Sequence, residues 1–344
     1  MRYPEFLKQG GRIGFIAPSF GCATSPYIER FDSALSEFER RGFVNVCGDN
    51  CRKDAGIGKS NTPEACGTEI NDFFLHDKSD VIISCGGGEL MCEDLPFVDF
   101  DGIKKAAPKW YLGYSDNTNL TFLLPTLTDT ASIYGPCVSD FGMKPWHQSI
   151  DDAFSLLTGK KKAFSNYEGW EKGWPDREED PCAPYNITEK YEQVICGGKT
   201  EVSFKGRFLG GCLDCLSMLC GTKFDRVKEF NERYKDDGII WFLESCDLNV
   251  MSMRRVLWQL KNAGWFDSAK GFLIGRPLHF EDDFNGFKPH DAYEGILSEF
   301  NVPIVMDIDL GHLSPMMPFV SGGYGTVTAR ENSLMVEYDF SRPE

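Results

Sequence analysis

The chain has 344 residues, 42% of them hydrophobic and 26% charged, so it can bury an ordinary globular core and is long enough for two domains. Its 36 Lys and Arg against 52 Asp and Glu give a formal net charge of −16 at pH 7. This balance excludes nucleic acids and anionic membranes as expected partners, because both are bound through clustered basic side chains. With no apolar signal segment and no apolar run near the roughly 18 residues of a membrane span, we expect a cytoplasmic protein with thirteen reduced cysteines.

Residues 1–143 alternate predicted strands with predicted helices. In chain order the elements are a strand over 12–17, a helix from Ser25-Pro26 with Ser25 as its cap, a strand over 44–47, a helix from Thr62-Pro63, a strand over 80–85, a strand over 109–113 and a helix over 116–127. This alternation predicts an α/β domain with an open parallel sheet of the Rossmann or flavodoxin-like type. Functional loops of such sheets lie at the carboxyl ends of the strands.

Residues 144–205 have a different character. Trp146, Trp170 and Trp174 alternate there with Gly, Pro and an acidic stretch over 176–180. We expect a loop-rich connection, and connections of this length are often functional.

Residues 206–344 predict a second α/β domain. Its predicted elements are a helix after Gly210-Gly211, a buried strand over 238–243, a helix over 250–263, strands over 271–274 and 302–308, and a hairpin over 325–338. The sequence therefore predicts two α/β domains with a site in the cleft between them.

The strand over 109–113 leads directly into Tyr114-Ser115-Asp116 and a helix. A serine at such a strand-to-helix corner exposes its hydroxyl while the following N–H groups stay unpaired. This is the arrangement of a nucleophile elbow, with Ser115 as the nucleophile.

A serine nucleophile needs a base and a group that orients the base. Among the five histidines, His312 is the best candidate, because it follows a strand, is flanked by Gly311 and lies in a Gly- and Pro-rich loop. His279 is the second candidate. Glu244 ends a buried strand, where it either caps the following segment or holds the imidazole, and the pattern favours neither.

Three further motifs have both a structural and a functional interpretation. Gly86-Gly87-Gly88 is either a tight turn or a loop whose backbone N–H binds an oxyanion. The segment over 56–60 ends like a phosphate-binding loop but lacks the upstream glycine spacing. Cys212-x-x-Cys215 lies in an apolar helical stretch, so buried structural thiols are favoured over a metal site.

Gly113-Tyr114-Ser115-Asp116-Asn117-Thr118, preceded by Pro108-Lys109-Trp110, resembles the nucleophile signature of the LD-carboxypeptidase family of serine peptidases. That family includes muramoyl-tetrapeptide carboxypeptidases and microcin C self-immunity peptidases. The resemblance covers nearly the whole chain through Ile13–Ser19, Gly86-Gly87, Tyr134-Gly135-Pro136, Phe208–Leu213, Phe242-Leu243-Glu244 and Gly311-His312. It implies a triad of Ser115, Glu244 and His312, with the N–H groups of Gly87 and Asp116 binding the oxyanion.

The resemblance also implies a reaction without metal or cofactor. The implied substrate is a murein-type peptide that loses its terminal D-amino acid, and the implied assembly is a homodimer. Gly88-Glu89 after the glycine pair and Arg254-Arg255 in place of Asp-Arg depart from the family pattern.

The long connection is more similar to the microcin-immunity branch. Trp170 or Trp174 would there help to hold a peptidyl or aminoacyl nucleotide, although loop anchoring explains both equally well. Gly86 and Gly88 would also line the substrate. From a different class of protein, a non-catalytic small-molecule binding module remains the alternative to an enzyme.

Overall fold

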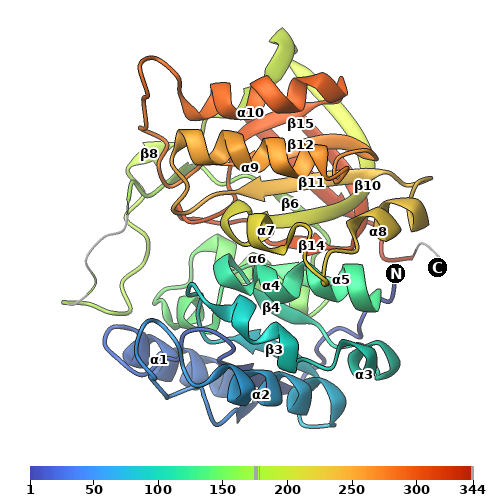
Figure 1. Cartoon of the computed structure of the whole chain (residues 1–344). Coiled ribbons are helices and arrows are strands. Elements are labelled where there is room, and N and C mark those ends of the chain that lie inside the picture. The colour runs from blue at the N-terminus through green and yellow to red at the C-terminus, as the bar shows by residue number, and fades with distance from the viewer. Residues whose placement is uncertain (174–176, 178, 342–344) are drawn as a thin grey trace. The chain divides into compact units, whose positions relative to one another are not determined.

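The computed structural model describes residues 1–173, 177 and 179–341. The chain divides into two compact units, one formed by residues 1–161 with 175–185 and the other by 162–174 with 186–344. The residues of the predicted connection are thus divided between the two units. Figure 1 labels many of the elements of each unit.

The first unit has parallel strands in the order β5-β4-β3-β1-β2, which is the flavodoxin-like order. The strands are β1 (Arg12–Ile16), β2 (Val44–Cys47), β3 (Val81–Ser84), β4 (Tyr111–Gly113) and β5 (Ser132–Tyr134). The helices are α1 (Tyr27–Arg40), α2 (Pro63–Leu75), α3 (Phe100–Lys105), α4 (Thr118–Thr121), α5 (Leu123–Thr128) and α6 (Gln148–Leu157), with short 3-10 turns over Met91–Glu93, Leu95–Phe97, Ser115–Asn117 and Val138–Gly142.

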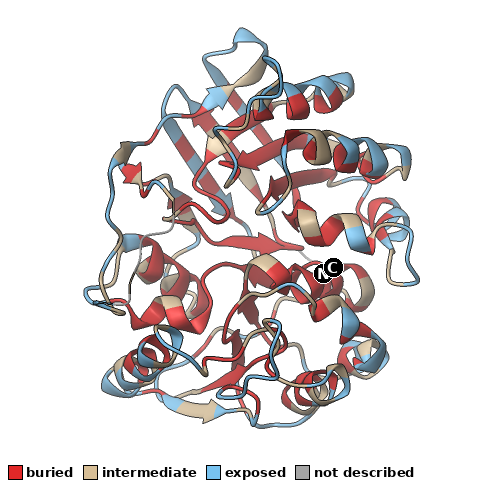
Figure 2. Cartoon of the chain, turned by 60° about the vertical axis from the view of Figure 1, so that its left-hand side comes forward, coloured by how far each residue is buried: buried red, intermediate tan, exposed pale blue. Residues whose placement is uncertain are grey.

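The core of this unit lies between the sheet and its helices. Ile82 of β3 and Tyr111 of β4 are fully buried and belong to one apolar cluster with Ile70 of α2 and Leu120 of α4. Figure 2 shows the central strands buried, while the outer faces of the helices are exposed. The continuous apolar runs of the sequence therefore form strands that are covered on both faces.

Two predicted helix boundaries were wrong. Helix α1 begins at Tyr27 with Pro26 in the cap position and no side-chain cap, so Ser25 does not cap it. The predicted helix over 116–127 is divided into a 3-10 turn, α4 and α5. Pro125 accounts for the break between α4 and α5, because it has no N–H to donate to the carbonyl of Thr121.

The second unit has a mixed sheet in the order β6-β16-β15-β10-β11-β12-β13-β9, whose strands β10 to β13 are parallel to one another. The strands are β6 (Ala163–Ser165), β7 (Gly169–Trp170), β8 (Glu189–Lys190), β9 (Val194–Ile195), β10 (Glu201–Cys212), β11 (Ile239–Glu244), β12 (Ala269–Gly275), β13 (Ile304–Ile308), β14 (Phe319–Ser321), β15 (Tyr324–Arg330) and β16 (Ser333–Tyr338). The helices are α7 (Leu213–Leu219), α8 (Val227–Arg233), α9 (Val250–Asn262) and α10 (Pro289–Leu297), with 3-10 turns over Cys196–Gly198 and Ser298–Phe300.

The carboxyl ends of β11, β12 and β13 lie together, since Leu243 pairs with Ile274 and Gly275 pairs with Ile308. This edge carries Glu244 and the loop with His312. The fold class predicted from the sequence, an open parallel sheet followed by a second α/β domain, is confirmed. The closing hairpin is confirmed as β15 and β16, whereas the long strand β10 was not predicted.

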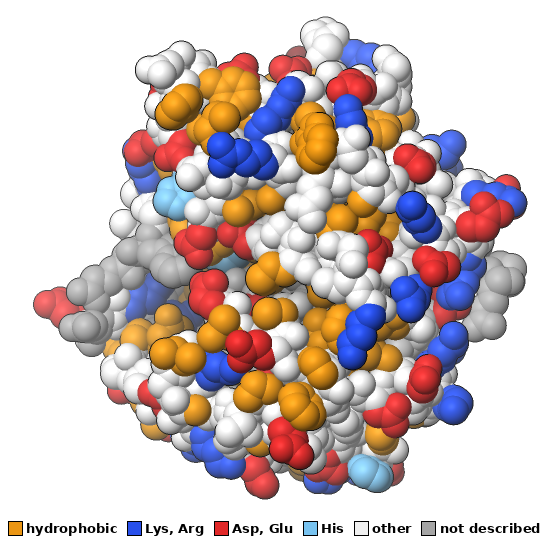
Figure 3. Space-filling view, viewed as in Figure 1, with side chains coloured by type: hydrophobic (Ala, Val, Ile, Leu, Met, Phe, Trp, Pro, Cys, Tyr) orange, Lys and Arg blue, Asp and Glu red, His pale blue; other side chains and the backbone are white. Residues whose placement is uncertain are grey.

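Charged side chains of both signs are interspersed on the face shown in Figure 3, so the acidic excess does not gather there in one place. Within the described part of the chain, no helix is long and apolar enough to cross a membrane. All thirteen cysteines fall in the described ranges, and each is a reduced thiol without a disulfide.

Candidate functional site

Ser115 stands at a strained corner directly after β4. Its φ of +62° lies in the left-handed region, which residues with a side chain rarely adopt. The backbone N–H of Ser115 donates to the hydroxyl oxygen of Tyr134 at 3.0 Å, and this bond holds the corner against β5. The side chain of Ser115 is half-buried at the start of the turn that precedes α4. This conformation is the one expected of a nucleophile elbow.

The glycine loop after β3 packs against this corner. A Cβ added to Gly87 would lie only 3.1 Å from the Cβ and 3.2 Å from the Oγ of Ser115. The Gly86 carbonyl accepts from the Asn117 side-chain amide at 2.8 Å and is thereby tied to the elbow. Gly88 has a φ of +147°, and a Cβ there would lie 2.1 Å from the Oγ of Ser19. A glycine is therefore needed at 88 for packing alone.

The carboxylate of Asp116 is bonded to segments that neighbour the glycine loop in the sequence or pack on it. Its Oδ2 accepts from the Ser19 hydroxyl at 2.5 Å and from the Met91 N–H at 2.9 Å. Its Oδ1 accepts from the Asn119 amide at 3.0 Å. These bonds give the buried side chain a structural role.

Glu244 and His312 form a buried pair at the carboxyl edge of the second sheet. The Nδ1 of His312 lies 2.9 Å from the Oε2 of Glu244, and the two side chains are 3% and 0% exposed. A carboxylate at this distance fixes the tautomer and orientation of an imidazole. Of the two interpretations of Glu244, the pairing with His312 is the one that the structure contains.

The environment of His312 changes its proton affinity in two directions. Burial lowers the pKa of the imidazole, but the negative charge of Glu244 and hydrogen bonds with Cys246 and Glu244 outweigh burial and raise the pKa well above 6.5. Burial also raises the pKa of the Cys246 thiol, more than its hydrogen bond with His312 lowers it. The carboxylate of Glu244 thus favours the protonated form of the His312 imidazole.

Gly311 permits the close approach of the His312 loop to Glu244. Its φ is +102°, and a Cβ there would lie 2.7 Å from the Oε2 and 2.9 Å from the Cβ of Glu244. A larger residue would force the loop away from the carboxylate. The Gly-His dipeptide in the sequence therefore reflects contact between two strand ends.

The other histidines differ from His312. His279, the second candidate, is exposed. His290 forms a pair that sequence reasoning missed, since its Nε2 lies 2.7 Å from the Oδ2 of Asp307. That imidazole is 43% exposed, and the bond with Asp307 raises its pKa. His290 is the second residue of α10, and its local sequence gives no signal for a partner seventeen residues later.

Trp170 lies in β7 of the second unit and is half-buried. Its ring packs edge-to-face on Phe280, with centroids 5.3 Å apart, and the guanidinium of Arg276 lies 5.1 Å from its centroid. The next residue, Glu171, donates its N–H to the carbonyl of Ser314 at 2.7 Å. The Trp170 segment is therefore bonded to the loop that carries His312. Trp174, the other predicted aromatic, lies outside the described residues.

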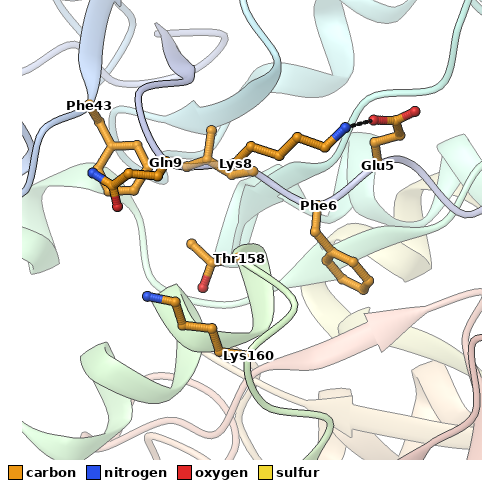
Figure 4. A pocket seen from close by; sticks show the side chains of 8 residues that line it. Glu5, Phe6, Lys8, Gln9, Phe43, Thr158 and Lys160 are labelled. Atoms are coloured by element: carbon orange, nitrogen blue, oxygen red, sulfur yellow. Dashed lines mark hydrogen bonds and ion pairs between the residues drawn. The ribbon is translucent and has the colours of Figure 1, made fainter.

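The remaining candidate features contain no predicted site residue. A recess of about 500 Å³ in the first unit is lined by the segment 5–9 together with Phe43, Thr158 and Lys160, and Figure 4 shows its side chains with the Lys8–Glu5 ion pair. A second recess of about 490 Å³ lies between β2 and α2.

Among the described residues, no cluster of His, Cys, Asp and Glu is placed to hold a metal ion. Cys212 and Cys215 are buried thiols, as predicted.

Two protein-family models match the chain. The LD-carboxypeptidase N-terminal domain matches residues 13–135, and the LD-carboxypeptidase C-terminal domain matches residues 205–327. The first match contains Ser115 and the glycine loop, and the second contains Glu244 and His312.

The chain is also similar to curated proteins over most of its length. It is 27% identical to the microcin C7 self-immunity protein MccF of Escherichia coli over 324 residues, which covers 92% of this chain and 90% of the relative. It is 25% identical over 347 residues to the "Probable murein peptide carboxypeptidase" of Bacillus subtilis (strain 168), covering 97% and 94%.

Solved structures have the same fold. An MccF-like protein from Bacillus anthracis str. Ames superposes with a TM-score of 0.82 at 22% identity, covering 98% of this chain and 100% of the other. MccF in complex with glutamyl sulfamoyl guanosine superposes with a TM-score of 0.79 at 22% identity, covering 98% of each chain. With both domain models matched around the elbow and the Glu244–His312 pair, the chain belongs to the LD-carboxypeptidase family of serine peptidases.

Proposed function

We propose that this protein is a serine hydrolase that cleaves an amide bond, acting as an LD-carboxypeptidase that releases a terminal D-amino acid from murein-type peptides. The observation that carries the proposal is the buried Glu244–His312 pair. Burying an ionisable pair costs desolvation free energy, and buried groups with shifted pKa values concentrate at functional sites. The strained Ser115 corner supplies the matching nucleophile.

The proposed reaction follows the chemistry of a serine triad. Ser115 attacks the carbonyl carbon, and His312 accepts the hydroxyl proton and then donates it to the leaving amine. Glu244 orients the imidazole and stabilises the imidazolium that forms. Water then attacks the acyl-enzyme with His312 again as the base, and this step frees the shortened peptide.

We propose that the N–H groups of Gly87 and Asp116 bind the oxyanion. The packing of Gly87 against Ser115 supports the first assignment. The second is supported by the position of Asp116 directly after the nucleophile and by the three hydrogen bonds that occupy its carboxylate. Each such donor is worth about 3 kcal/mol in comparable enzymes.

The direct test is hydrolysis of an L,D-tetrapeptide, with release of D-alanine as the measured product. The wild-type protein is expected to turn over this peptide, and Ser115→Ala is expected to abolish turnover while keeping its thermal unfolding transition. Hydrolysis by Ser115→Ala at the wild-type rate would disprove the nucleophile assignment.

The second candidate is a peptidase of the microcin-immunity type that cleaves a peptidyl or aminoacyl nucleotide. The half-buried ring of Trp170, packed on Phe280, favours it, because such a surface suits stacking of a nucleobase. The MccF relative supports the same candidate. A parallel assay with an aminoacyl-sulfamoyl adenosine discriminates the two, and Trp170→Ala is expected to raise KM for the nucleotide only.

A fluorophosphonate probe separates both enzymes from a non-catalytic binding module. Covalent labelling at Ser115 is expected of the enzyme, whereas tight ligand binding without labelling supports the module. The proposed homodimer is tested by light scattering of the eluting protein during size-exclusion chromatography.

A further inference from the structure

The second unit contains another buried ion pair, and one of its members, Asp309, lies three residues before His312. The guanidinium of Arg276 contacts the carboxylate of Asp309, and these side chains are 5% and 0% exposed. Arg276 follows β12 and Asp309 follows β13, so the pair joins two neighbouring strand ends at the carboxyl edge of the sheet. Burial raises the pKa of Asp309, and the charge of Arg276 opposes that change.

Asp309 connects this edge to two other segments. Its Oδ2 accepts the N–H of Tyr167 at 2.8 Å, and its backbone carbonyl accepts the N–H of Met317 at 2.8 Å. The first bond reaches the segment with Trp170, and the second closes the loop that contains His312. Asp309 therefore bonds to both segments, through its carboxylate to one and through its backbone carbonyl to the other.

Arg276 contacts the end of β13 and the Trp170 segment. Its Nη1 donates to the carbonyl of Asp307 at 2.7 Å, which holds the end of β13. The guanidinium also lies 5.1 Å from the ring centroid of Trp170 and 5.8 Å from that of Tyr191. A planar, always charged guanidinium can donate from two nitrogens to two acceptors and still stack on the rings, which a lysine ammonium cannot.

We propose that Arg276 and Asp309 are positioning residues that hold the His312 loop and the Trp170 segment as one body. This inference rests on the proposed role of His312 as the base. It assigns to the pair the alignment of the imidazole with Glu244, together with the placement of the Trp170 ring. Loss of either charge would loosen both together, because Asp309 holds the Trp170 segment through its carboxylate and the His312 loop through its backbone carbonyl. Arg276 in turn fixes the Asp309 carboxylate and the end of β13.

The chain contains a matched control pair at the opposite edge of the same sheet. Arg207 and Asp237 are 5% and 8% exposed, with the Nη2 of Arg207 2.6 Å from the Oδ2 of Asp237. Arg207 also stacks on Tyr234, with its guanidinium 3.9 Å from the ring centroid. In the pairing of β10 with β11, Arg207 lies opposite Ile239 at the amino end of β11, whereas Glu244 is at the carboxyl end. The two pairs share chemistry and burial but differ in position.

The experiment compares Arg276→Met with Arg207→Met in the full chain. Three readouts are measured: kcat on the L,D-tetrapeptide, the low-field NMR signal of the proton between His312 and Glu244, and amide hydrogen exchange of Tyr167. For Arg276→Met we expect kcat to fall about 10- to 100-fold, since small misplacements of catalytic groups have effects of this size. We also expect the low-field signal to broaden and exchange at Tyr167 to rise at least about tenfold.

Arg207→Met is expected to lower the unfolding temperature but to leave kcat within about twofold and the low-field signal unchanged. Arg276→Lys keeps the charge beside Asp309 and carries the test if Arg276→Met does not fold. It is expected to recover the Tyr167 protection in part and to leave kcat reduced, because it loses the forked contact.

The inference is overturned if the Arg276 variants leave all three readouts where Arg207→Met leaves them. Failure of the proposed function has a different signature, since a wild-type protein inert toward both substrates removes only the kinetic readout. The NMR signal and the exchange of Tyr167 then still decide whether the pair positions the loop.

Discussion

The two units hold their candidate catalytic groups by different means. In the first unit the backbone itself places Ser115, through a φ of +62° and the bond of its N–H to Tyr134. In the second unit side chains contribute more, because a buried carboxylate orients His312 and the loop is bonded to the backbone of Asp309, whose side chain pairs with Arg276. A nucleophile needs exposure and a fixed direction, whereas a base needs a controlled charge, so strain suits the first group and electrostatics the second.

Removal of either reacting group is expected to have the largest effect. Ser115→Ala and His312→Ala should each lower kcat by about 10⁴-fold or more, and the double variant should be no worse than either alone, because groups acting as one unit are not additive. Steady-state and single-turnover kinetics measure this. Additive losses would break the comparison, since the two units would then not serve one reaction.

Glu244→Gln tests the electrostatic half of the comparison. The base must be neutral, so kcat/KM should rise with pH through the pKa of His312, which lies well above 6.5. Loss of the carboxylate charge should move this acid limb to lower pH and reduce kcat about 10²- to 10⁴-fold. The pH profiles of kcat/KM for both proteins measure the shift, and an unmoved limb would contradict it.

The same pair predicts the direction of a stability change. Because folding raises the pKa of His312, the stabilisation is complete below the unfolded value near 6.5 and is lost as pH rises through the folded value. Glu244→Gln should therefore lose more unfolding free energy at pH 6 than at pH 10. Urea unfolding at the two pH values tests this order.

Gly311→Ala tests how closely the second unit is packed around its pair. The new Cβ would lie 2.7 Å from the Oε2 of Glu244 at a φ of +102°, so we expect a loss of about 1–3 kcal/mol in unfolding free energy and a displaced His312. Gly286→Ala is the control, because Gly286 has a φ of +87° with nothing within 4 Å. Equal losses at both positions would assign the effect to backbone strain alone.

Asp94→Asn has the smallest expected effect and concerns the first unit. Asp94 is 1% exposed, and neither carboxyl oxygen has a hydrogen-bond partner. Burial, together with the charge of Asp116, raises its pKa to about 8 against the favourable charge of Lys59. Wild-type stability should therefore fall as pH rises from about 4 to about 8, since the folded state binds the extra proton.

Asparagine removes that cost, so Asp94→Asn should be more stable than wild type by about 1–2 kcal/mol at pH 8 and equal to it near pH 4. Glu69→Gln is the contrast, because this buried carboxylate accepts the N–H groups of Ala17 and Asn50. It should be destabilised, and a stabilised Glu69→Gln would refute the explanation by hydrogen bonding.

Local patterns were sufficient for much of this molecule. The apolar runs predicted the buried strands, and the strand-to-helix corner predicted the elbow, because periodicity and turn chemistry depend on neighbouring residues. The break between α4 and α5 is also local, because it depends on Pro125 alone. The family resemblance supported the catalytic roles of Glu244 and His312. Pattern alone left open whether Glu244 is a helix cap and whether His279 is the base instead of His312.

The sequence by itself determined the fold class, the corner at Ser115 and the residue types available for catalysis. Only the tertiary structure decided which charges are paired, since Glu244 meets His312 across 68 positions, Arg276 meets Asp309 across 33, and His290 meets Asp307 across 17. These pairings depend on which strand ends lie side by side in a sheet, and no local pattern encodes that order. The long-range burial that brings strand ends together is therefore what converts separate motifs into oriented, charged groups.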